Sequence, residues 1–182
     1  CVAPDYILVE RSVKDEFLVD LKKWMVRMYG ADATENDAYV KMINQKHFDR
    51  VTGLIDPEKV IFGGGRNERT MQIQPTILDD VTAEDAVMQE EIFGPIFPIL
   101  SVDSMAEAEE FICKREKPLA LYLFTQNKAL AERFLRYVPF GGGCINDTII
   151  HLATSRMGFG GVGGSGMGSY HGKKSFETFS HE

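Results

Sequence analysis

The sequence predicts an α/β fold of three layers, in which a mixed, mostly parallel sheet has helices on both faces. Short runs of strand-forming residues alternate with segments whose apolar residues recur at helical spacing. This order of strand, helix, strand and helix is typical of a parallel or mixed sheet covered by helices. The 182 residues contain neither repeats nor a recognisable linker. We therefore expect residues 1–182 to form a single domain.

The first third of the chain predicts one strand and two helices. Residues 6–9 form a short apolar run of strand formers. Ser12 is the expected N-cap of a following helix, which Gly30 is expected to end as a C-cap. The apolar stripe of that helix comprises Phe17, Leu21, Trp24, Met25 and Met28. A second helix is predicted for residues 44–55.

The middle of the chain predicts three extended segments. They are residues 60–62, residues 72–78 and the nearly all-apolar residues 95–102, which are typical of a buried strand. Pro75 indicates an edge strand, because proline has no N–H to donate to a neighbouring strand. A helix is expected after Ser104.

The last third predicts a further strand and helix, followed by two short strands. Residues 119–124 are expected to form the strand, and Asn127 to begin a helix that reaches Val138. The two short strands are predicted at residues 142–146 and 148–151.

Composition excludes several classes of function. The net charge of -7 argues against a nucleic-acid-binding surface, which needs clustered basic residues. No apolar run reaches the roughly 18 residues of a membrane-spanning helix. Cys1, Cys113 and Cys144 are the only cysteines, and their spacing suggests neither a disulfide framework nor a zinc site. Cys113 and Cys144 are expected to be buried, as free cysteines usually are. No bound metal is expected. The predicted location is the reducing cytoplasm.

Three sequence blocks suggest a family. They are CVAPDY at residues 1–6, EEIFGP at residues 90–95 and the tail FGGVGGSGMGSYHGKKSFETFSH at residues 159–181. In this order they resemble the aldehyde dehydrogenase superfamily, and most closely its class 3 branch, which includes fatty-aldehyde and aromatic-aldehyde dehydrogenases. The resemblance covers essentially the whole chain. It implies the catalytic half of such an enzyme, with a Rossmann cofactor-binding domain upstream.

The resemblance implies that Cys1 is the nucleophile. A thiolate adds to the aldehyde carbonyl, and the resulting thiohemiacetal transfers hydride to NAD or NADP and leaves a thioester that water hydrolyses. The asparagine and glutamate that assist this chemistry in the family lie upstream of this chain. In the chain alone, the N–H of Cys1 is part of an amine and not of an amide. We therefore expect the isolated chain to be inactive as a dehydrogenase.

The remaining site residues also follow from the resemblance. Glu91 and Phe93 occupy the positions that bind the nicotinamide ribose and ring in the family, and a carboxylate can accept hydrogen bonds from both ribose hydroxyls. The positions that line the substrate pocket are Leu152, Ala153, Phe159 and His171. His171 could equally be held by backbone partners. The segment HLATSRMG before this tail diverges from the family, which leaves the aldehyde preference open.

The glycine-rich tail fits the pattern GxGxxG twice, at residues 158–163 and 161–166. That pattern indicates dinucleotide binding only between a strand and a helix, with an acidic residue about 20 positions later. The tail lacks this context. Its glycines are expected to let the backbone pass close to other atoms.

Two other functions remain open from sequence. Cys1 could be the nucleophile of an N-terminal-nucleophile amidohydrolase, which predicts an antiparallel sandwich of long strands. Alternatively, the chain could be a non-catalytic assembly module that keeps the family fold. The family resemblance also implies a homodimer.

Overall fold

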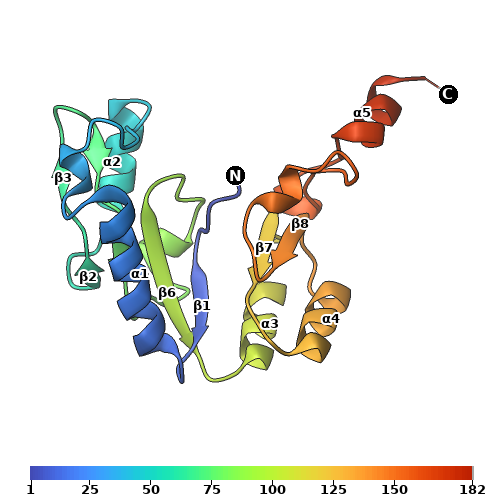
Figure 1. The fold of residues 1–182 in the computed structure, drawn as a ribbon, viewed down its shortest axis with the longest axis horizontal. Coiled ribbons are helices and arrows are strands. Elements are labelled where there is room, and N and C mark those ends of the chain that lie inside the picture. The colour runs from blue at the N-terminus through green and yellow to red at the C-terminus, as the bar shows by residue number, and fades with distance from the viewer. Residues whose placement is uncertain (182) are drawn as a thin grey trace. The chain divides into compact units, whose positions relative to one another are not determined.

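The computed structural model describes residues 1–181, which divide into two compact units. The first unit, here called the N-terminal unit, comprises Pro4–Ser104. The second, here called the C-terminal unit, comprises Cys1–Ala3 together with the described chain from Met105 onward. Figure 1 shows the elements of both.

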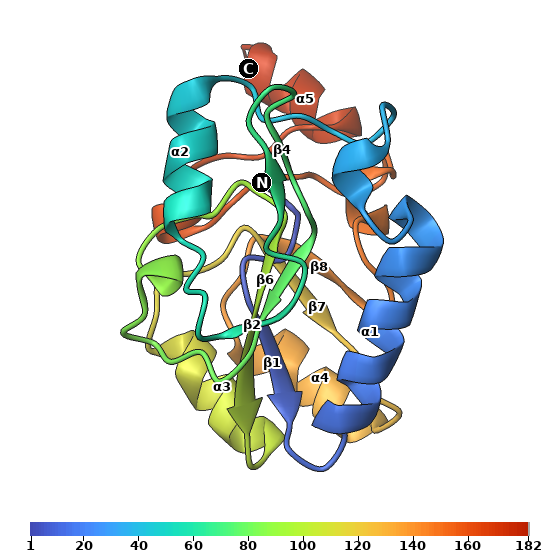
Figure 2. The ribbon, with the colours of Figure 1, turned by 90° about the vertical axis from the view of Figure 1, so that its left-hand side faces the viewer.

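A four-stranded sheet forms the centre of the N-terminal unit, in the order β1-β6-β5-β2. The bounds of these strands are Ile7–Glu10, Ile96–Val102, Thr76–Leu78 and Val60–Phe62. The central strand β6 pairs in parallel with β1 and β5, while β2 is antiparallel to β5. Figure 2 shows β1 and β6 side by side. The prediction of a mixed, mostly parallel sheet is therefore confirmed.

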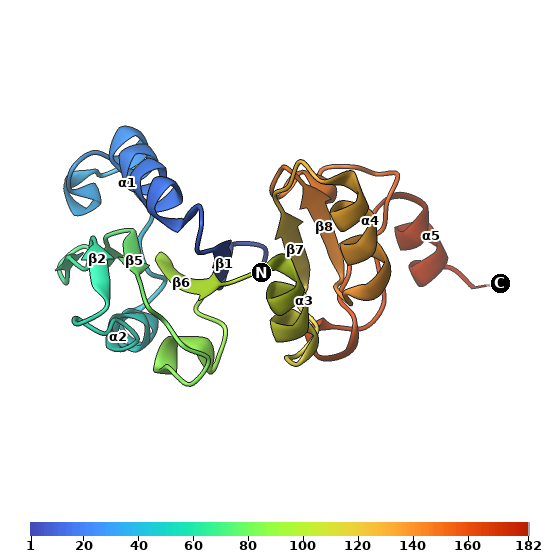
Figure 3. The same ribbon diagram turned by 90° about the horizontal axis from the view of Figure 1, so that it is seen from below.

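Two helices cover the opposite faces of this sheet (Figure 3). Helix α1 (Lys14–Tyr29) packs on one face, and the core there consists of Val9, Leu18, Met25, Ile77 and Ile99. Helix α2 (Gln45–Gly53) lies on the other face and buries Phe48 and Val51. Short elements complete the unit: the antiparallel pair β3 (Arg66–Asn67) and β4 (Gln72–Ile73), and the 3-10 helices η1 (Ala33–Glu35) and η2 (Ala86–Met88).

The helix ends agree with the sequence prediction in part, since α2 ends at Gly53 and not at residue 55. Gly30 is the C-cap of α1 with a φ of 88°, and its N–H donates to the Val26 carbonyl. Asn44 caps α2 by accepting from the His47 N–H at 3.0 Å. Ser12, however, is not the N-cap of α1. Val13 holds that position without a side-chain hydrogen bond.

The prediction of an edge strand near Pro75 is wrong. Strand β5 lies between β6 and β2 and is therefore internal. Pro75 immediately precedes β5, where its missing N–H removes no bond between strands. The proline instead separates β4 from β5, which the sequence suggested as one extended segment.

The C-terminal unit is built around a parallel pair of strands. Helix α3 (Met105–Cys113) precedes β7 (Ala120–Leu123), and helix α4 (Lys128–Tyr137) connects β7 to its partner β8 (Gly142–Ile145). The remaining elements are the 3-10 helices η3 (Ile150–Leu152) and η4 (Gly163–Ser165) and helix α5 (Gly172–Phe179). Asn127 caps α4, as expected, by accepting from the Leu130 N–H.

The C-terminal unit corrects two predictions and adds one helix. Residues 148–151 do not form a strand, because Asn146 turns the chain with a φ of 55° and η3 follows. Cys113 is exposed at the end of α3 and not buried, whereas Cys144 is half-buried in β8. Helix α5 was not foreseen.

The described residues contain neither a candidate membrane-spanning helix nor a candidate metal-binding cluster. None of their helices is both long and apolar enough to cross a bilayer. Residues 1–181 also contain no group of three or more His, Cys, Asp and Glu side chains that could hold a metal ion.

Candidate active site

Cys1 is exposed, and the residue after it is attached to the C-terminal unit. The hydroxyl of Tyr122 donates a hydrogen bond to the Val2 carbonyl at 2.8 Å. Tyr122 lies on β7 opposite Cys144 of β8, so that strand pairing fixes its backbone. Burial raises the pKa of Tyr122, which keeps the phenol neutral and able to donate. The backbone next to the thiol therefore has a defined position.

An aromatic cluster extends from Tyr122 to two of the predicted substrate residues. The ring centroids of Tyr122 and His151 are 5.8 Å apart, and those of His151 and Phe159 are 6.0 Å apart. Phe159 in turn stacks on His171 at 5.8 Å, and Tyr170 meets His171 edge-on at 4.6 Å. The fold thus brings Phe159 and His171 together with the residue that holds Val2. His171 is placed mainly by aromatic contacts of its ring.

His151 occupies the middle of this aromatic cluster and is only 7% exposed. Its Nδ1 lies 3.6 Å from the Sγ of Cys144. Its Nε2 is buried and has no hydrogen-bond partner among the described residues. Burial lowers the pKa of His151, so the ring is neutral at pH 7. No sequence signal indicated its contact with Cys144.

Leu152 and Ala153 follow His151 directly, at the end of η3. Their N–H groups donate to the carbonyls of Ile149 and Ile150, both at 3.0 Å. Leu152 is half-buried and Ala153 is exposed. Ile149 has a φ of 64°, which is an outlier for a β-branched residue. All four predicted substrate residues therefore belong to the C-terminal unit and lie within or beside the aromatic cluster.

The two predicted cofactor residues belong to the N-terminal unit, in the loop between η2 and β6. Ile92 is buried at their midpoint, while Glu91 and Phe93 on either side are exposed. Phe93 is 63% exposed and has a φ of 49°, a strained conformation for a bulky residue. Strain of this kind persists only where the surrounding structure enforces it, and it is concentrated at functional sites.

Two side chains that the sequence analysis missed hold this loop. The guanidinium of Arg50, on α2, forms an ion pair with Glu90 at 3.0 Å and donates to the carbonyls of Glu91 and Ile92 at 3.3 and 2.6 Å. The Asp5 carboxylate accepts from the Ile92 N–H at 3.0 Å. Burial raises the pKa of Asp5, although this hydrogen bond opposes the rise. Asp5 belongs to the block CVAPDY, whereas no sequence signal identified Arg50.

Comparison with known proteins assigns the chain to a family. The model of the aldehyde dehydrogenase family matches residues 1–182. The chain belongs to the aldehyde dehydrogenase family. It is 50% identical to 4,4'-diaponeurosporen-aldehyde dehydrogenase of Staphylococcus aureus, with all of this chain and 40% of that protein covered. The expected class 3 resemblance is confirmed by 48% identity to aldehyde dehydrogenase family 3 member A2 of Rattus norvegicus, of which 38% is covered.

Further comparisons agree with this assignment. The dimeric NADP-preferring aldehyde dehydrogenase of Bos taurus is 49% identical, with all of this chain and 76% of that protein covered. A solved structure of the substrate-bound state of Staphylococcus aureus AldH has a TM-score of 0.96 and 49% identity, over 99% of this chain and 40% of that one. Among these relatives, the chain spans about 40% of the length of those from Staphylococcus and rat.

The glycine-rich tail of this aldehyde dehydrogenase family member folds back on its own backbone. Phe159 and Tyr170 form an isolated antiparallel bridge. A Cβ on Gly160 would lie 2.2 Å from the carbonyl oxygen of Gly168, and one on Gly161 would lie 2.2 Å from that of Ser165. These glycines permit close contact between backbone segments. No strand–helix unit surrounds them in the described chain, as expected from rejecting the dinucleotide-binding pattern.

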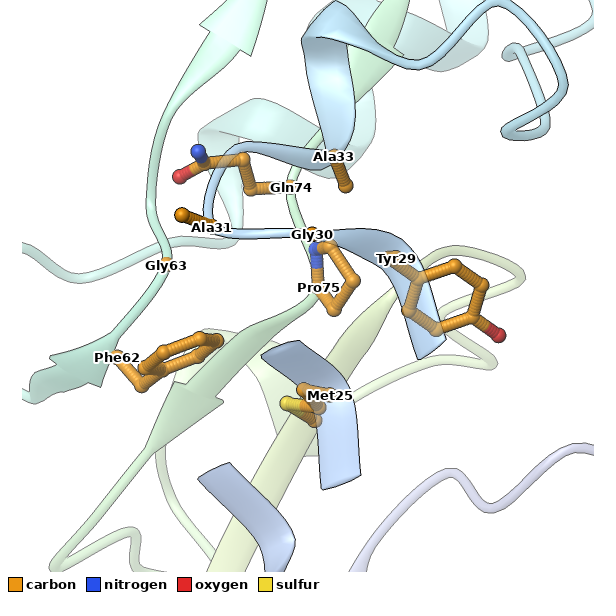
Figure 4. A pocket seen from close by; sticks show the side chains of 9 residues that line it. All are labelled: Met25, Tyr29, Gly30, Ala31, Ala33, Phe62, Gly63, Gln74 and Pro75. Carbon is orange, nitrogen blue, oxygen red and sulfur yellow. The ribbon is translucent and has the colours of Figure 1, made fainter. Parts of the chain in front are cut away.

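One small pocket of the N-terminal unit contains none of the predicted site residues. Figure 4 shows it between the end of α1 and the turns around Gly63 and Pro75, with Met25 and Phe62 at its base. Its volume is about 60 Å³, well below the roughly 300 Å³ of a typical ligand site. We assign it no role in the chemistry of this family member.

Proposed function

We propose that the protein to which this chain belongs oxidises an aldehyde to a carboxylic acid with NAD or NADP, and that Cys1 is its nucleophile. The main support is the hydrogen bond between Tyr122 and Val2. It joins the backbone of Cys1 to the aromatic cluster that contains Phe159 and His171. Family membership supports the same assignment. The choice between NAD and NADP depends on the upstream part of the protein.

The proposed chemistry begins with the thiolate of Cys1, which is exposed and therefore accessible to an aldehyde. Its sulfur bonds to the carbonyl carbon and forms a thiohemiacetal. Glu91 and Phe93 would hold the nicotinamide cofactor, which would supply the hydride acceptor for the conversion of the thiohemiacetal to a thioester. Water then hydrolyses the thioester and regenerates the thiol. Phe159, Leu152, Ala153 and His171 would bind and orient the aldehyde during these steps.

The loop at Glu91–Phe93 fits the cofactor on its own geometry. The exposed Glu91 carboxylate can accept hydrogen bonds from both hydroxyls of a ribose. The exposed ring of Phe93 provides a flat apolar surface for a nicotinamide. Arg50 and Asp5 hold the backbone between them, so that neither side chain depends on a flexible loop. These residues would bind and orient the cofactor.

The remaining proposals concern the whole protein. Residues 1–182 would constitute its catalytic domain, with a Rossmann cofactor domain upstream. A homodimer is supported by the Bos taurus relative, a dimeric NADP-preferring aldehyde dehydrogenase. We propose a cytoplasmic protein, consistent with three cysteines whose spacing suggests no disulfide framework.

Replacing Cys1 tests the function directly. In the longer protein, Cys1→Ser is expected to lower aldehyde-dependent reduction of NAD or NADP on the order of a thousandfold or more, because the hydroxyl is a much weaker nucleophile. Cys113→Ser removes a second exposed thiol and serves as the matched control, with activity unchanged. Full activity in Cys1→Ser would contradict the proposed nucleophile.

The alternatives make different predictions. An N-terminal-nucleophile amidohydrolase needs an antiparallel sandwich of long strands, but β1 is followed at once by α1 and pairs in parallel with β6. The fold therefore contradicts the amidohydrolase alternative. A non-catalytic module predicts that the longer protein reduces neither NAD nor NADP with any aldehyde, and that its Cys1 thiol titrates like an ordinary cysteine.

A further inference from the structure

The hydroxyl of Tyr122 contacts the backbone next to the proposed nucleophile. It donates to the Val2 carbonyl at 2.8 Å. The backbone of Ile149 partly offsets the rise in the pKa of Tyr122 that burial causes. Val2 directly follows Cys1, and Ile149 directly precedes η3, which contains Leu152. One hydroxyl therefore links the backbone next to the proposed nucleophile to strand β7.

The ring of Tyr122 is itself held in place. Its backbone is opposite Cys144 in the parallel pair of β7 and β8. Its face meets His151 at a centroid distance of 5.8 Å with the planes 60° apart. Such an edge-to-face contact restricts rotation of the ring. The phenol is therefore held by contacts other than Val2, and it sets the position of the Val2 carbonyl.

The strained backbone of Ile149 is a second, independent sign of constraint. A φ of 64° is unfavourable for a β-branched side chain and persists only where neighbouring groups enforce it. Strain at this position fixes the start of the segment that leads to Leu152 and Ala153.

We propose that Tyr122 is a positioning residue for the reaction at Cys1. Its hydroxyl fixes the Val2 carbonyl, and with it the thiol, relative to the ring of His151 and the aromatic cluster that contains Phe159 and His171. This inference rests on the proposed function. It adds a residue that acts through the backbone and does not itself touch the aldehyde. Geometric errors of this kind lower the rate of reaction more than they weaken binding.

The experiment compares Tyr122→Phe with a matched tyrosine in the longer protein that contains this chain. Tyr39 donates to the Ile73 carbonyl at 3.0 Å in the N-terminal unit, and Tyr39→Phe removes the same kind of hydrogen bond. Both variants should lower the melting temperature to a similar extent. Only Tyr122→Phe should reduce kcat with an aldehyde, by about threefold to tenfold, with the KM for the cofactor unchanged.

Hydrogen exchange provides a readout that does not depend on turnover. Deuterium uptake by a peptide covering residues 1–5 should rise in Tyr122→Phe and stay at the parent level in Tyr39→Phe. Equal kcat values in the two variants, or unchanged uptake, would overturn the positioning role while leaving the proposed function intact. An inactive parent protein would instead overturn the proposed function, and the positioning role with it.

Discussion

At the scale of single residues, burial changes the pKa of His151. Histidine ordinarily titrates near pH 6.5, but burial lowers the pKa of this ring in the folded protein. The unfolded chain therefore binds a proton at a higher pH than the folded chain does. The contribution of His151 to stability is therefore full above pH 6.5 and falls as the pH drops through that value toward the folded pKa.

Replacing His151 should remove this part of the acid sensitivity. We expect His151→Gln to narrow the difference between the melting temperatures measured at about pH 7.5 and about pH 5.5, because no buried imidazole is left to protonate. His181→Gln changes an exposed histidine and should retain the parent's difference. The other titratable groups that face the ring, Cys144 and Tyr122, are present in both variants. An unchanged difference in His151→Gln would show that another group causes the acid sensitivity.

At the scale of elements, the loop before β6 depends on its contact with α2. A Cβ on Gly94 would lie 2.6 Å from Cγ1 of Val51, which is fully buried on α2. Gly94→Ala should therefore destabilise the fold by about 1–3 kcal/mol, the usual cost of overpacking. It should also raise the KM for the cofactor, because the loop includes Phe93.

A second glycine provides the control. Gly53 ends α2, and a Cβ there would meet nothing within 4 Å. Gly53→Ala should be neutral or stabilising by up to about 1 kcal/mol, since alanine restricts the unfolded chain. Urea unfolding of the two variants measures both effects. Equal stability in the two variants would show that the loop moves away from α2 at no cost.

The elements also show why sequence predicted some features and not others. Helix α1 and strand β6 were predicted correctly because their periodicity and apolar content are local properties. The position of β5 was wrong because Pro75 constrains only its own N–H, whereas pairing with β6 on one side and β2 on the other depends on distant segments. Residues 148–151 have the composition of a strand, yet they form η3 because Asn146 has already turned the chain.

The candidate site also contains both residues that the sequence predicted and residues that it did not. Cys1, Glu91 and Phe93 could be proposed as site residues because they lie in contiguous blocks that resemble a known family. Their supporting residues could not. Arg50 is 40 residues or more from the loop that it holds, and Tyr122 is 120 residues from Val2. Single-sequence patterns contain no information on contacts over such distances.

At the scale of the whole molecule, we expect the chain to contain only part of what the proposed reaction needs. The chain spans about 40% of the Staphylococcus aureus relative. When the chain is produced alone, the nitrogen of Cys1 is an amine, which cannot stabilise an oxyanion as the corresponding amide N–H would. The structure thus predicts that chemical reactivity of the thiol and enzymatic activity can be separated.

The thiol of the isolated 182-residue chain should therefore react with an alkylating reagent, but the chain should have no dehydrogenase activity. Its Cys1 should be alkylated by iodoacetamide, because the thiol is exposed, and mass spectrometry of the N-terminal peptide would measure this. The same sample should reduce neither NAD nor NADP in the presence of an aldehyde, whereas the longer protein should reduce one of them. The control is the isolated chain with Cys1→Ser, which should lose alkylation at that peptide and remain inactive. Aldehyde-dependent reduction by the isolated chain would mean that residues 1–182 already contain a complete catalytic site.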